Sequence, residues 1–295
     1  MRGAHPERDV ERAVEEGGVL RRGEHVLIAC SGGPDSVALT ATLHSVAKRM
    51  ELELRVAFVN HGTRLSAWQD ECVVLQTAAQ FALPVEIVAL ESAPRGEQRL
   101  RTARYGALID VAKRFECGVV ATAHHAEDQT ETVLLALLRG TGPAGLRGMR
   151  GRRRLAPGLE VARPFLEITS ETLRAYCHAR ALPYAVDPSN ADTTLRRNAV
   201  REALAALRPL FPGLDEAVAR AAAVVADERD ATRRAVLRRS VRARLGEEDE
   251  LHDIDFLHVE EVVRALERGR TGTFHMKPGL TLRIESGAVT GITRE

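Results

Sequence analysis

The feature that most constrains the fold is a regular alternation of short apolar runs and longer helical patterns. Four runs rich in Val, Ile and Leu predict β-strands, and three stretches with helical spacing lie between them. This order indicates an α/β fold with a doubly wound parallel sheet, because parallel strands are joined by crossovers that are usually helical. The strands are expected at residues 26–29, 54–60, 85–90 and 118–122, and the helices at residues 36–50, 66–82 and 97–115.

The pattern changes after about residue 190. Helices rich in Ala, Arg and Leu follow, and no clear strand returns until Thr273. We therefore expect two domains, an α/β domain over residues 1–192 and a smaller, mainly helical domain over residues 193–295. A turn at residues 277–279 between two apolar runs predicts a hairpin that closes the chain.

Composition limits the classes of protein. No apolar run approaches the roughly 18 residues that cross a bilayer, and the charged first twenty residues lack the centre of a secretory signal. We therefore expect a cytoplasmic location and no membrane partner. The cysteines Cys30, Cys72, Cys117 and Cys177 form no C-x-x-C pair, which predicts neither a disulfide framework nor a zinc site.

Arginine is concentrated locally although the formal net charge is only +1. Residues 147–154 contain five arginines and no acid, so we interpret them as a contact for a polyanion such as nucleic acid. Residues 229–244 contain seven arginines in a helical pattern, which favours a solvated helix face.

The segment Ala29–Ser36 (ACSGGPDS) joins the first expected strand to the first expected helix. Such a junction presents backbone N–H groups at the positive end of a helix dipole, which suits phosphate. Gly32 and Gly33 allow the backbone to curl around the anion, while Asp35 can hold a magnesium ion. The chain contains neither the P-loop NTPase motif nor the dinucleotide-binding motif.

A second polar segment, His124–Thr132, follows the fourth expected strand, so it belongs to the same edge of the sheet. Asp128 and Glu131 are three residues apart and share one helix face. The pair can bind Mg²⁺, receive an ammonium group or accept a proton from an amine. First-turn acids that complement the helix dipole, and structural histidines, remain the alternatives.

These motifs together resemble the tRNA(Ile)-lysidine synthase family of N-type ATP pyrophosphatases, whose fold is adenine nucleotide alpha hydrolase-like. The SGGxDS loop is typical of the whole superfamily, whereas the HHxxDQxET and GxGxxGLxGM blocks resemble those of the family. Further blocks occur in the family's order: Val59–Gly62 with Arg64, Arg101–Tyr105, Arg163–Phe165, Asp187–Asn190, and Arg197–Asn198 with Arg201. Glu127 stands where Asp is usual.

The resemblance implies an ATP-dependent ligase that adenylates the wobble cytidine of a CAU-anticodon tRNA(Ile) and joins free L-lysine to it, with Mg²⁺ as cofactor. It implies catalytic roles for Asp35, Asp128, Glu131 and Arg104, with Asp35 as the magnesium ligand. Which carboxylate receives lysine stays open, as does a homodimer. Expected ATP contacts are Ser31, Gly32, Gly33, Pro34, Asp35, Ser36 and His61, and expected tRNA contacts are Arg150, Arg152, Arg153, Arg197 and Arg201.

Aromatic residues are few, and we expect Trp68 to pack in the core, whereas Tyr105 is a candidate for stacking on a base. Three other functions remain open. A tRNA thiolase would need paired cysteines, an amidotransferase of the GMP synthetase type would need an ammonia source, and a non-catalytic RNA-binding protein would not need Asp35, Asp128 and Glu131 together.

Overall fold

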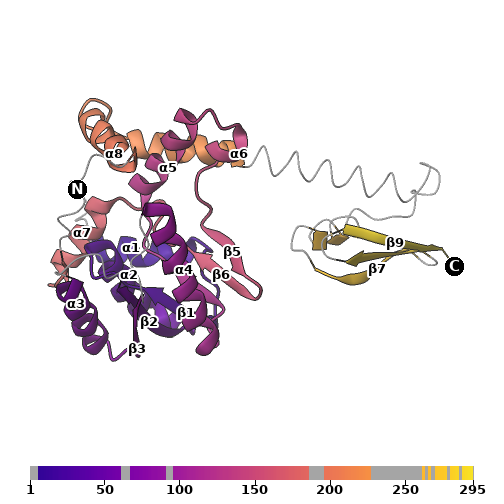
Figure 1. The fold of residues 1–295 in the computed structure, drawn as a ribbon, viewed down its shortest axis with the longest axis horizontal. Coiled ribbons are helices and arrows are strands. Elements are labelled where there is room, and N and C mark those ends of the chain that lie inside the picture. Colours follow the sequence, from indigo (N-terminus) through magenta and orange to yellow (C-terminus); the bar gives the residue numbers. More distant parts are fainter. Residues whose placement is uncertain are drawn as a thin grey trace. The chain divides into compact units, whose positions relative to one another are not determined.

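The computed structural model describes residues 6–60, 67–90, 96–185, 196–226, 261–262, 265–266, 270–277, 280–285 and 288–294. The chain forms two compact units, residues 1–222 and 223–295, and Figure 1 shows the elements of each. The expected domain boundary after residue 192 lies outside the described residues and stays a prediction.

The first unit is built on a six-stranded sheet with the order β3-β2-β1-β4-β6-β5. All neighbouring strands are parallel except β5, which pairs antiparallel with β6 at the edge. The chain builds outward from β1 to β3 and then returns to place β4 on the other side of β1, so strand order reverses between β1 and β4. The strands are β1 (His25–Ala29), β2 (Glu53–Asn60), β3 (Val85–Ala89), β4 (Val119–Ala121), β5 (Arg152–Ala156) and β6 (Leu159–Ala162).

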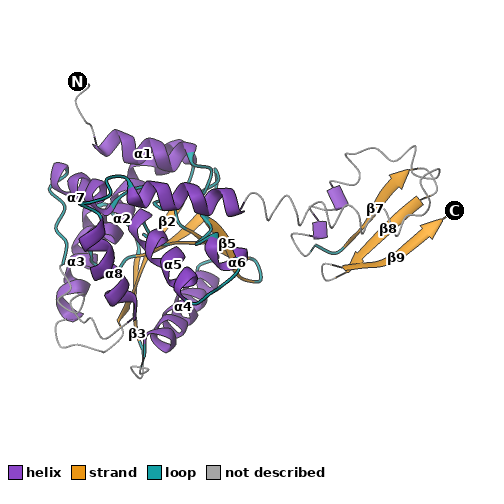
Figure 2. Ribbon diagram, turned by 90° about the horizontal axis from the view of Figure 1, so that it is seen from above, coloured by secondary structure: helices purple, strands orange, loops and turns teal. Residues whose placement is uncertain are grey.

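The predicted doubly wound α/β fold is confirmed, and the four expected strands are present. Helices cover both faces of the sheet, with α2 on one face and α4 on the other (Figure 2). The three expected helices are α2 (Pro34–Met50), α3 (Ala67–Gln80) and α4 (Glu97–Arg114). The unit also contains α1 (Pro6–Glu16), α5 (Ala126–Leu138), α6 (Pro143–Leu146), α7 (Ser170–Ala179) and α8 (Arg196–Leu207).

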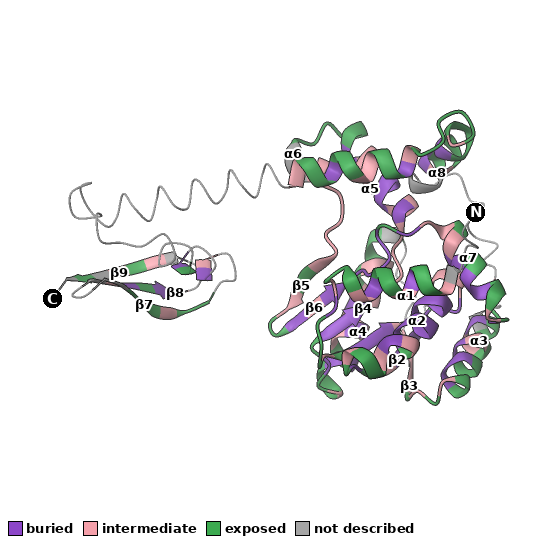
Figure 3. Ribbon diagram, turned by 180° about the vertical axis from the view of Figure 1, so that it is seen from behind, coloured by how far each residue is buried: buried purple, intermediate pink, exposed green. Residues whose placement is uncertain are grey.

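Apolar burial explains why these elements assemble. Val26, Leu27 and Ile28 of β1 are all fully buried, because successive side chains enter the cores on opposite faces of the sheet. Figure 3 shows α2 largely buried, between the sheet and neighbouring helices. A continuous apolar strand is the sequence pattern that such two-sided burial requires.

The second unit contains a three-stranded antiparallel sheet with the order β7-β8-β9. Its strands are β7 (Gly272–Lys277), β8 (Leu280–Glu285) and β9 (Ala288–Arg294), and Leu282 and Ile284 of β8 are fully buried. The predicted hairpin is confirmed as β7 and β8, while β9 was not predicted. The arginine-rich run at residues 229–244 lies outside the described residues.

One packing prediction is wrong. Trp68 lies near the start of α3 and is 62% exposed, so it is not a core residue.

The cysteines Cys30, Cys117 and Cys177 are buried, whereas Cys72 is exposed. Of the helices in the described part of the chain, none has the length and apolar character needed to cross a bilayer.

Candidate active site

The candidate site lies at the carboxyl edge of the sheet, where strand order reverses. The loop after β1 carries the SGGPDS motif, and the segment after β4 carries His124 and His125. These two strands are hydrogen-bonded neighbours. In open α/β sheets a ligand binds outside the strand ends at such a reversal, so the two motifs lie where a ligand is expected.

Ser36 organises the loop from within. Its hydroxyl donates to the carbonyl oxygen of Gly33 at 2.9 Å and accepts from the backbone N–H of Ser31 at 3.1 Å. The Ser31 hydroxyl lies 3.2 Å from the same oxygen. Gly33 is the N-cap of α2 and Pro34 is its first residue, a position that suits proline because the first N–H of a helix has no intrahelical acceptor. Ser36 therefore holds the loop in shape at the helix N-terminus.

Gly32 is required by its surroundings. Its φ is +84°, a left-handed conformation that side chains rarely adopt. A Cβ there would lie 2.8 Å from the backbone oxygen of Asp70 in α3. The carbonyl of Gly32 accepts from the N–H of Ala185 at 2.9 Å. The loop is therefore clamped between α3 and the segment after α7, and only glycine fits.

His125 is the centre of an acidic group. Its Nδ1 lies 2.8 Å from a carboxylate oxygen of Glu127, and its Nε2 lies 3.6 Å from oxygens of both Asp35 and Asp128. The His125 backbone N–H also donates to Asp128 at 3.2 Å, which caps α5. The structure thus brings Asp35 and Asp128 together at one nitrogen of the imidazole ring, with Glu127 at the other.

The charges follow from this arrangement. Burial lowers the pKa of His125, but the hydrogen bond to Glu127 and the charges of Asp128 and Asp35 outweigh it and raise the pKa to about 9. Burial raises the pKa of Glu127, but its bond to His125 lowers it to about 2. For Asp35, burial raises the pKa and His125 opposes the shift. At neutral pH His125 is a cation between carboxylates.

Glu127 also reaches a second helix. Its carboxylate accepts from the Ser170 backbone N–H at 3.0 and 3.1 Å and from the Ser170 hydroxyl at 2.9 Å. Ser170 is the first residue of α7, where an acid complements the helix dipole. Glu127 therefore fixes the His125 ring relative to α7.

Glu131 pairs with a residue outside the acidic group around His125. It is only 2% exposed, and its carboxylate accepts from Arg201 of α8 at 2.7 and 3.2 Å. Two parallel N–H···O contacts of this kind are the strong form of an arginine–carboxylate pair. Glu131 thus anchors α8 against α5, next to the acids around His125.

The arginines expected to bind tRNA have different surroundings. Arg152 is held inside the protein by Glu24 at 2.7 Å and by Glu160, whereas Arg153 is exposed on β5. Arg163 donates to the carbonyl of Arg150 at 2.8 Å. His61 and the side chain of Arg197 lie outside the described residues, so their assigned roles stay predictions.

The acids offer the oxygen ligands that Mg²⁺ prefers. Asp35 Oδ1 is buried and has no hydrogen-bond partner in the described structure. No group of three or more His, Cys, Asp or Glu side chains suited to a metal occurs among the described residues. Mg²⁺ bound with a nucleotide usually takes only one or two carboxylates, with phosphate and water completing its shell. The residues present therefore fit a magnesium ion that arrives with a nucleotide.

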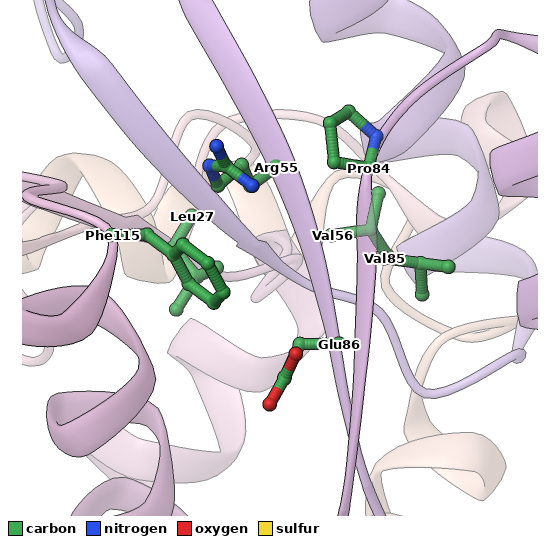
Figure 4. Close-up of a pocket in the computed structure, with 7 residues that line it drawn as sticks. All are labelled: Leu27, Arg55, Val56, Pro84, Val85, Glu86 and Phe115. Atoms are coloured by element: carbon green, nitrogen blue, oxygen red, sulfur yellow. The ribbon is translucent and has the colours of Figure 1, made fainter.

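A small hollow occurs elsewhere on the sheet. It is lined by Leu27, Val56 and Phe115 among others, with Arg55 placed 4.3 Å from the centre of the Phe115 ring (Figure 4). Its volume is about 20 Å³, which is room for about one water molecule. It cannot hold a nucleotide and is not the candidate site.

Sequence reasoning left the role of His125 open, placed Arg163 in a family block without a role, and missed Ser170. The adjacent histidines marked this segment as a candidate site, but the contact of the His125 ring with Asp35 depends on how the loop after β1 folds. Ser170 is 43 residues from Glu127, and no local pattern joins them.

Comparison with known proteins agrees with this geometry. Residues 4–207 match the PP-loop domain family, so the candidate site belongs to a PP-loop domain. A tRNA(Ile)-lysidine synthase from Thermosynechococcus vestitus is 34% identical over 270 residues, which cover 90% of this chain and 77% of that protein. The chain belongs to the tRNA(Ile)-lysidine synthase family.

Two further likenesses add detail. A tRNA(Ile)-lysidine synthase from Salinispora tropica is 44% identical over 207 residues, which cover 68% of this chain and 62% of that protein. This chain therefore matches somewhat less than two thirds of that relative. The solved structure of a U34-tRNA thiolase from Methanococcus maripaludis, with its [4Fe-4S] cluster, has a TM-score of 0.63 and 17% identity, and the match covers 75% of this chain and 78% of that one. The second likeness concerns the fold alone.

Proposed function

We propose that the protein is a tRNA(Ile)-lysidine synthase. Its reaction is the ligation of lysine to C2 of the wobble cytidine in a CAU-anticodon tRNA(Ile), with release of AMP and pyrophosphate. The observation that carries the proposal is that Asp35, from the glycine loop, and Asp128, from α5, both lie 3.6 Å from the same nitrogen of His125. Family membership supports the choice of substrate.

The loop supports the first step, in which cytidine O2 attacks the α-phosphorus of ATP and pyrophosphate leaves. The N-terminus of α2 and the hydroxyl of Ser31 offer donors for the leaving pyrophosphate, while Ser36 holds the loop in shape. Mg²⁺ held by Asp35 would neutralise phosphate charge. The rigid loop positions these groups before ATP arrives, which is how an enzyme stabilises developing charge most effectively.

The acids support the second step, in which the ε-amine of lysine attacks C2 and AMP leaves. The amine must lose a proton before or during attack, and a carboxylate beside the reacting carbon can accept it. Asp128 lies within the His125 group, whereas Glu131 is paired with Arg201. We therefore assign lysine binding to Asp128, with Glu131 holding Arg201 in place. Arg104 stays a proposed contact for phosphate charge.

The experiment supplies the purified protein with ATP, Mg²⁺, lysine and a CAU-anticodon isoleucine transcript, then digests the RNA and measures the mass of the wobble nucleoside. We expect a gain equal to lysine less one water. Sulfur incorporation would instead identify a thiolase, and an unchanged nucleoside with retained RNA binding would identify a binding protein. Either result would overturn the proposal.

Variants locate the chemistry. Asp35→Asn should abolish pyrophosphate release while RNA binding persists, because the change removes charge but little volume. Asp110→Asn, on the exposed face of α4, is the matched control and should keep full activity. Full activity in Asp35→Asn would remove Asp35 from the mechanism. The cytoplasmic location and a homodimer stay predictions.

A further inference from the structure

A third element, α7, borders the candidate site beside the glycine loop and the start of α5. It packs on α1 and α2 (Figure 2). Its first residue, Ser170, donates to the Glu127 carboxylate, and the Sγ of Cys177 donates to the carbonyl oxygen of Pro34 at 3.4 Å. The first contact reaches the acidic group around His125, and the second reaches the first residue of α2. The helix α7 therefore runs from the acidic group to the glycine loop.

Arg174 lies on the same face of α7 as these two contacts. Ser170, Arg174 and Cys177 are spaced at i, i+4 and i+7, which an α-helix brings onto one side. Leu173 and Tyr176, on the neighbouring side of the helix, are fully buried, whereas Arg174 is exposed. Arg174 is therefore positioned between the two contacts, where the site meets solvent.

The charge of Arg174 acts on Asp35. Burial raises the pKa of the Asp35 carboxyl, while the positive charges of His125 and Arg174 oppose that shift. Asp35 is the second residue of α2, so the guanidinium lies near the helix N-terminus at which terminal phosphates are expected. Arg174 thus adds positive charge to the start of α2 from the α7 side.

No acid holds Arg174 in the described part of the chain, where its side chain makes no hydrogen bond or ion pair. Other arginines of the neighbourhood are already paired. Arg180, later in the same segment, binds Glu11 of α1, and Arg201 binds Glu131. A guanidinium that is not engaged in this way keeps its N–H donors for an incoming anion.

We propose that Arg174 binds the terminal phosphates of ATP and so completes the phosphate site that the glycine loop begins. The loop supplies backbone N–H groups and the Ser31 hydroxyl, and Arg174 supplies paired guanidinium donors from α7. A cation there also suits the first step of the proposed reaction, because negative charge grows on the leaving pyrophosphate as its bond to the α-phosphorus breaks. The inference deepens the proposed function and rests on its placement of ATP in the glycine loop.

Free lysine is the other substrate with a negative group, because a guanidinium can bind its α-carboxylate through the same paired donors. The phosphates are favoured because Arg174 acts on Asp35, within the loop motif itself, and because they carry more negative charge than one carboxylate. The two assignments predict different effects of removing Arg174, so measurements on one variant separate them.

The test measures nucleotide binding, so it does not depend on lysine ligation. Calorimetry gives the affinity of the purified protein for ATP with Mg²⁺ and for AMP, which lacks the terminal phosphates. Arg174→Gln removes the charge, and Arg174→Lys keeps the charge without the paired donors. Lys48→Gln is the matched control, since Lys48 is an exposed cation in the last turn of α2, at the opposite end of that helix from the glycine loop. Because Arg174 is exposed, thermal unfolding should show all three variants to be folded.

We expect Arg174→Gln to weaken ATP binding about tenfold, the loss typical of one hydrogen-bonded charge contact. AMP binding should stay equal to that of Lys48→Gln, and Arg174→Lys should recover part of the ATP affinity. ATP affinity equal to that of the control would overturn the proposal. An equal loss for ATP and AMP would also overturn it, because Arg174 would then contact the α-phosphate or the nucleoside.

Steady-state kinetics separates the lysine alternative. A rise of the KM for lysine in Arg174→Gln, with ATP affinity unchanged, would show that Arg174 binds the lysine carboxylate and would overturn the assignment to phosphate. Failure of the parent protein to ligate lysine would contradict the proposed function. A selective loss of ATP affinity in Arg174→Gln would still support the phosphate contact in that case.

Discussion

The clamp on Gly32 predicts a strong effect of one added methyl group. In Gly32→Ala the residue must keep a φ of +84°, which costs an L-residue about 1–2 kcal/mol. The new Cβ also meets the Asp70 carbonyl oxygen at 2.8 Å. That neighbour is backbone and cannot rotate away, so overpacking adds about 1–3 kcal/mol.

Gly23→Ala separates the two contributions. Gly23 has a φ of +78°, close to that of Gly32, but a Cβ there meets nothing within 4 Å. Thermal and urea unfolding of both variants should show Gly32→Ala to be less stable than Gly23→Ala by about 1–3 kcal/mol. Calorimetry should show that ATP binding is lost only in Gly32→Ala, because relief of the contact moves the loop. Equal stability of the two variants, with ATP affinity unchanged, would refute the clamp.

Three further predictions concern the surroundings of the site. Nitrogen NMR at pH 7.5 should show His125 as a cation and His124 as neutral, since burial lowers the pKa of His124 to about 3 while His125 has a pKa of about 9; two neutral rings would contradict the acidic group. Because the pKa of His125 is raised in the folded protein, its contribution to stability is complete below about pH 6.5 and is lost as the pH rises toward 9. In urea unfolding, the free energy of unfolding of Glu127→Gln should therefore fall less over that pH range than that of the parent protein. Arg201→Met should destabilise the protein by about 1–3 kcal/mol because it leaves the buried Glu131 carboxylate without this partner, and an unchanged unfolding midpoint would show that the pair is not structural.

A thiol assay tests the packing independently. Burial raises the pKa of Cys177 to about 12 and also raises the pKa of Cys30 and of Cys117. Cys72 alone of the four is exposed, so a thiol reagent should label one cysteine rapidly in the folded protein and all four in denaturant. Rapid labelling of Cys30 would contradict the packing of the loop.

The sheet could be predicted from the sequence because a strand that is buried on both faces is a continuous apolar run. The apolar run at Val26–Ile28 is readable without tertiary information, and so is the glycine loop that follows it. The β5–β6 hairpin was missed because β5 is an edge strand with the sequence RRRLA. Its charged side chains find solvent or distant acids, so the usual alternation of apolar and polar residues is absent.

The site was predicted in part for the same reason. Motif spacing placed Asp35 and Asp128 at one edge, but the contact of Glu127 with Ser170 and that of Glu131 with Arg201 join residues 43 and 70 positions apart. Such pairings are set by tertiary packing, of α8 on α5 and of α7 on α1 and α2. Local spacing carries no signal for them, although helix patterns predicted that Asp128 and Glu131 share a face.

The most direct measurement is a structure of the protein with a non-hydrolysable ATP analogue and Mg²⁺. We predict that the terminal phosphates lie against the backbone N–H groups at the start of α2, within hydrogen-bond distance of Ser31 or Ser36, with the metal on Asp35. A triphosphate bound away from the glycine loop, with that loop bare, would contradict the proposed chemistry.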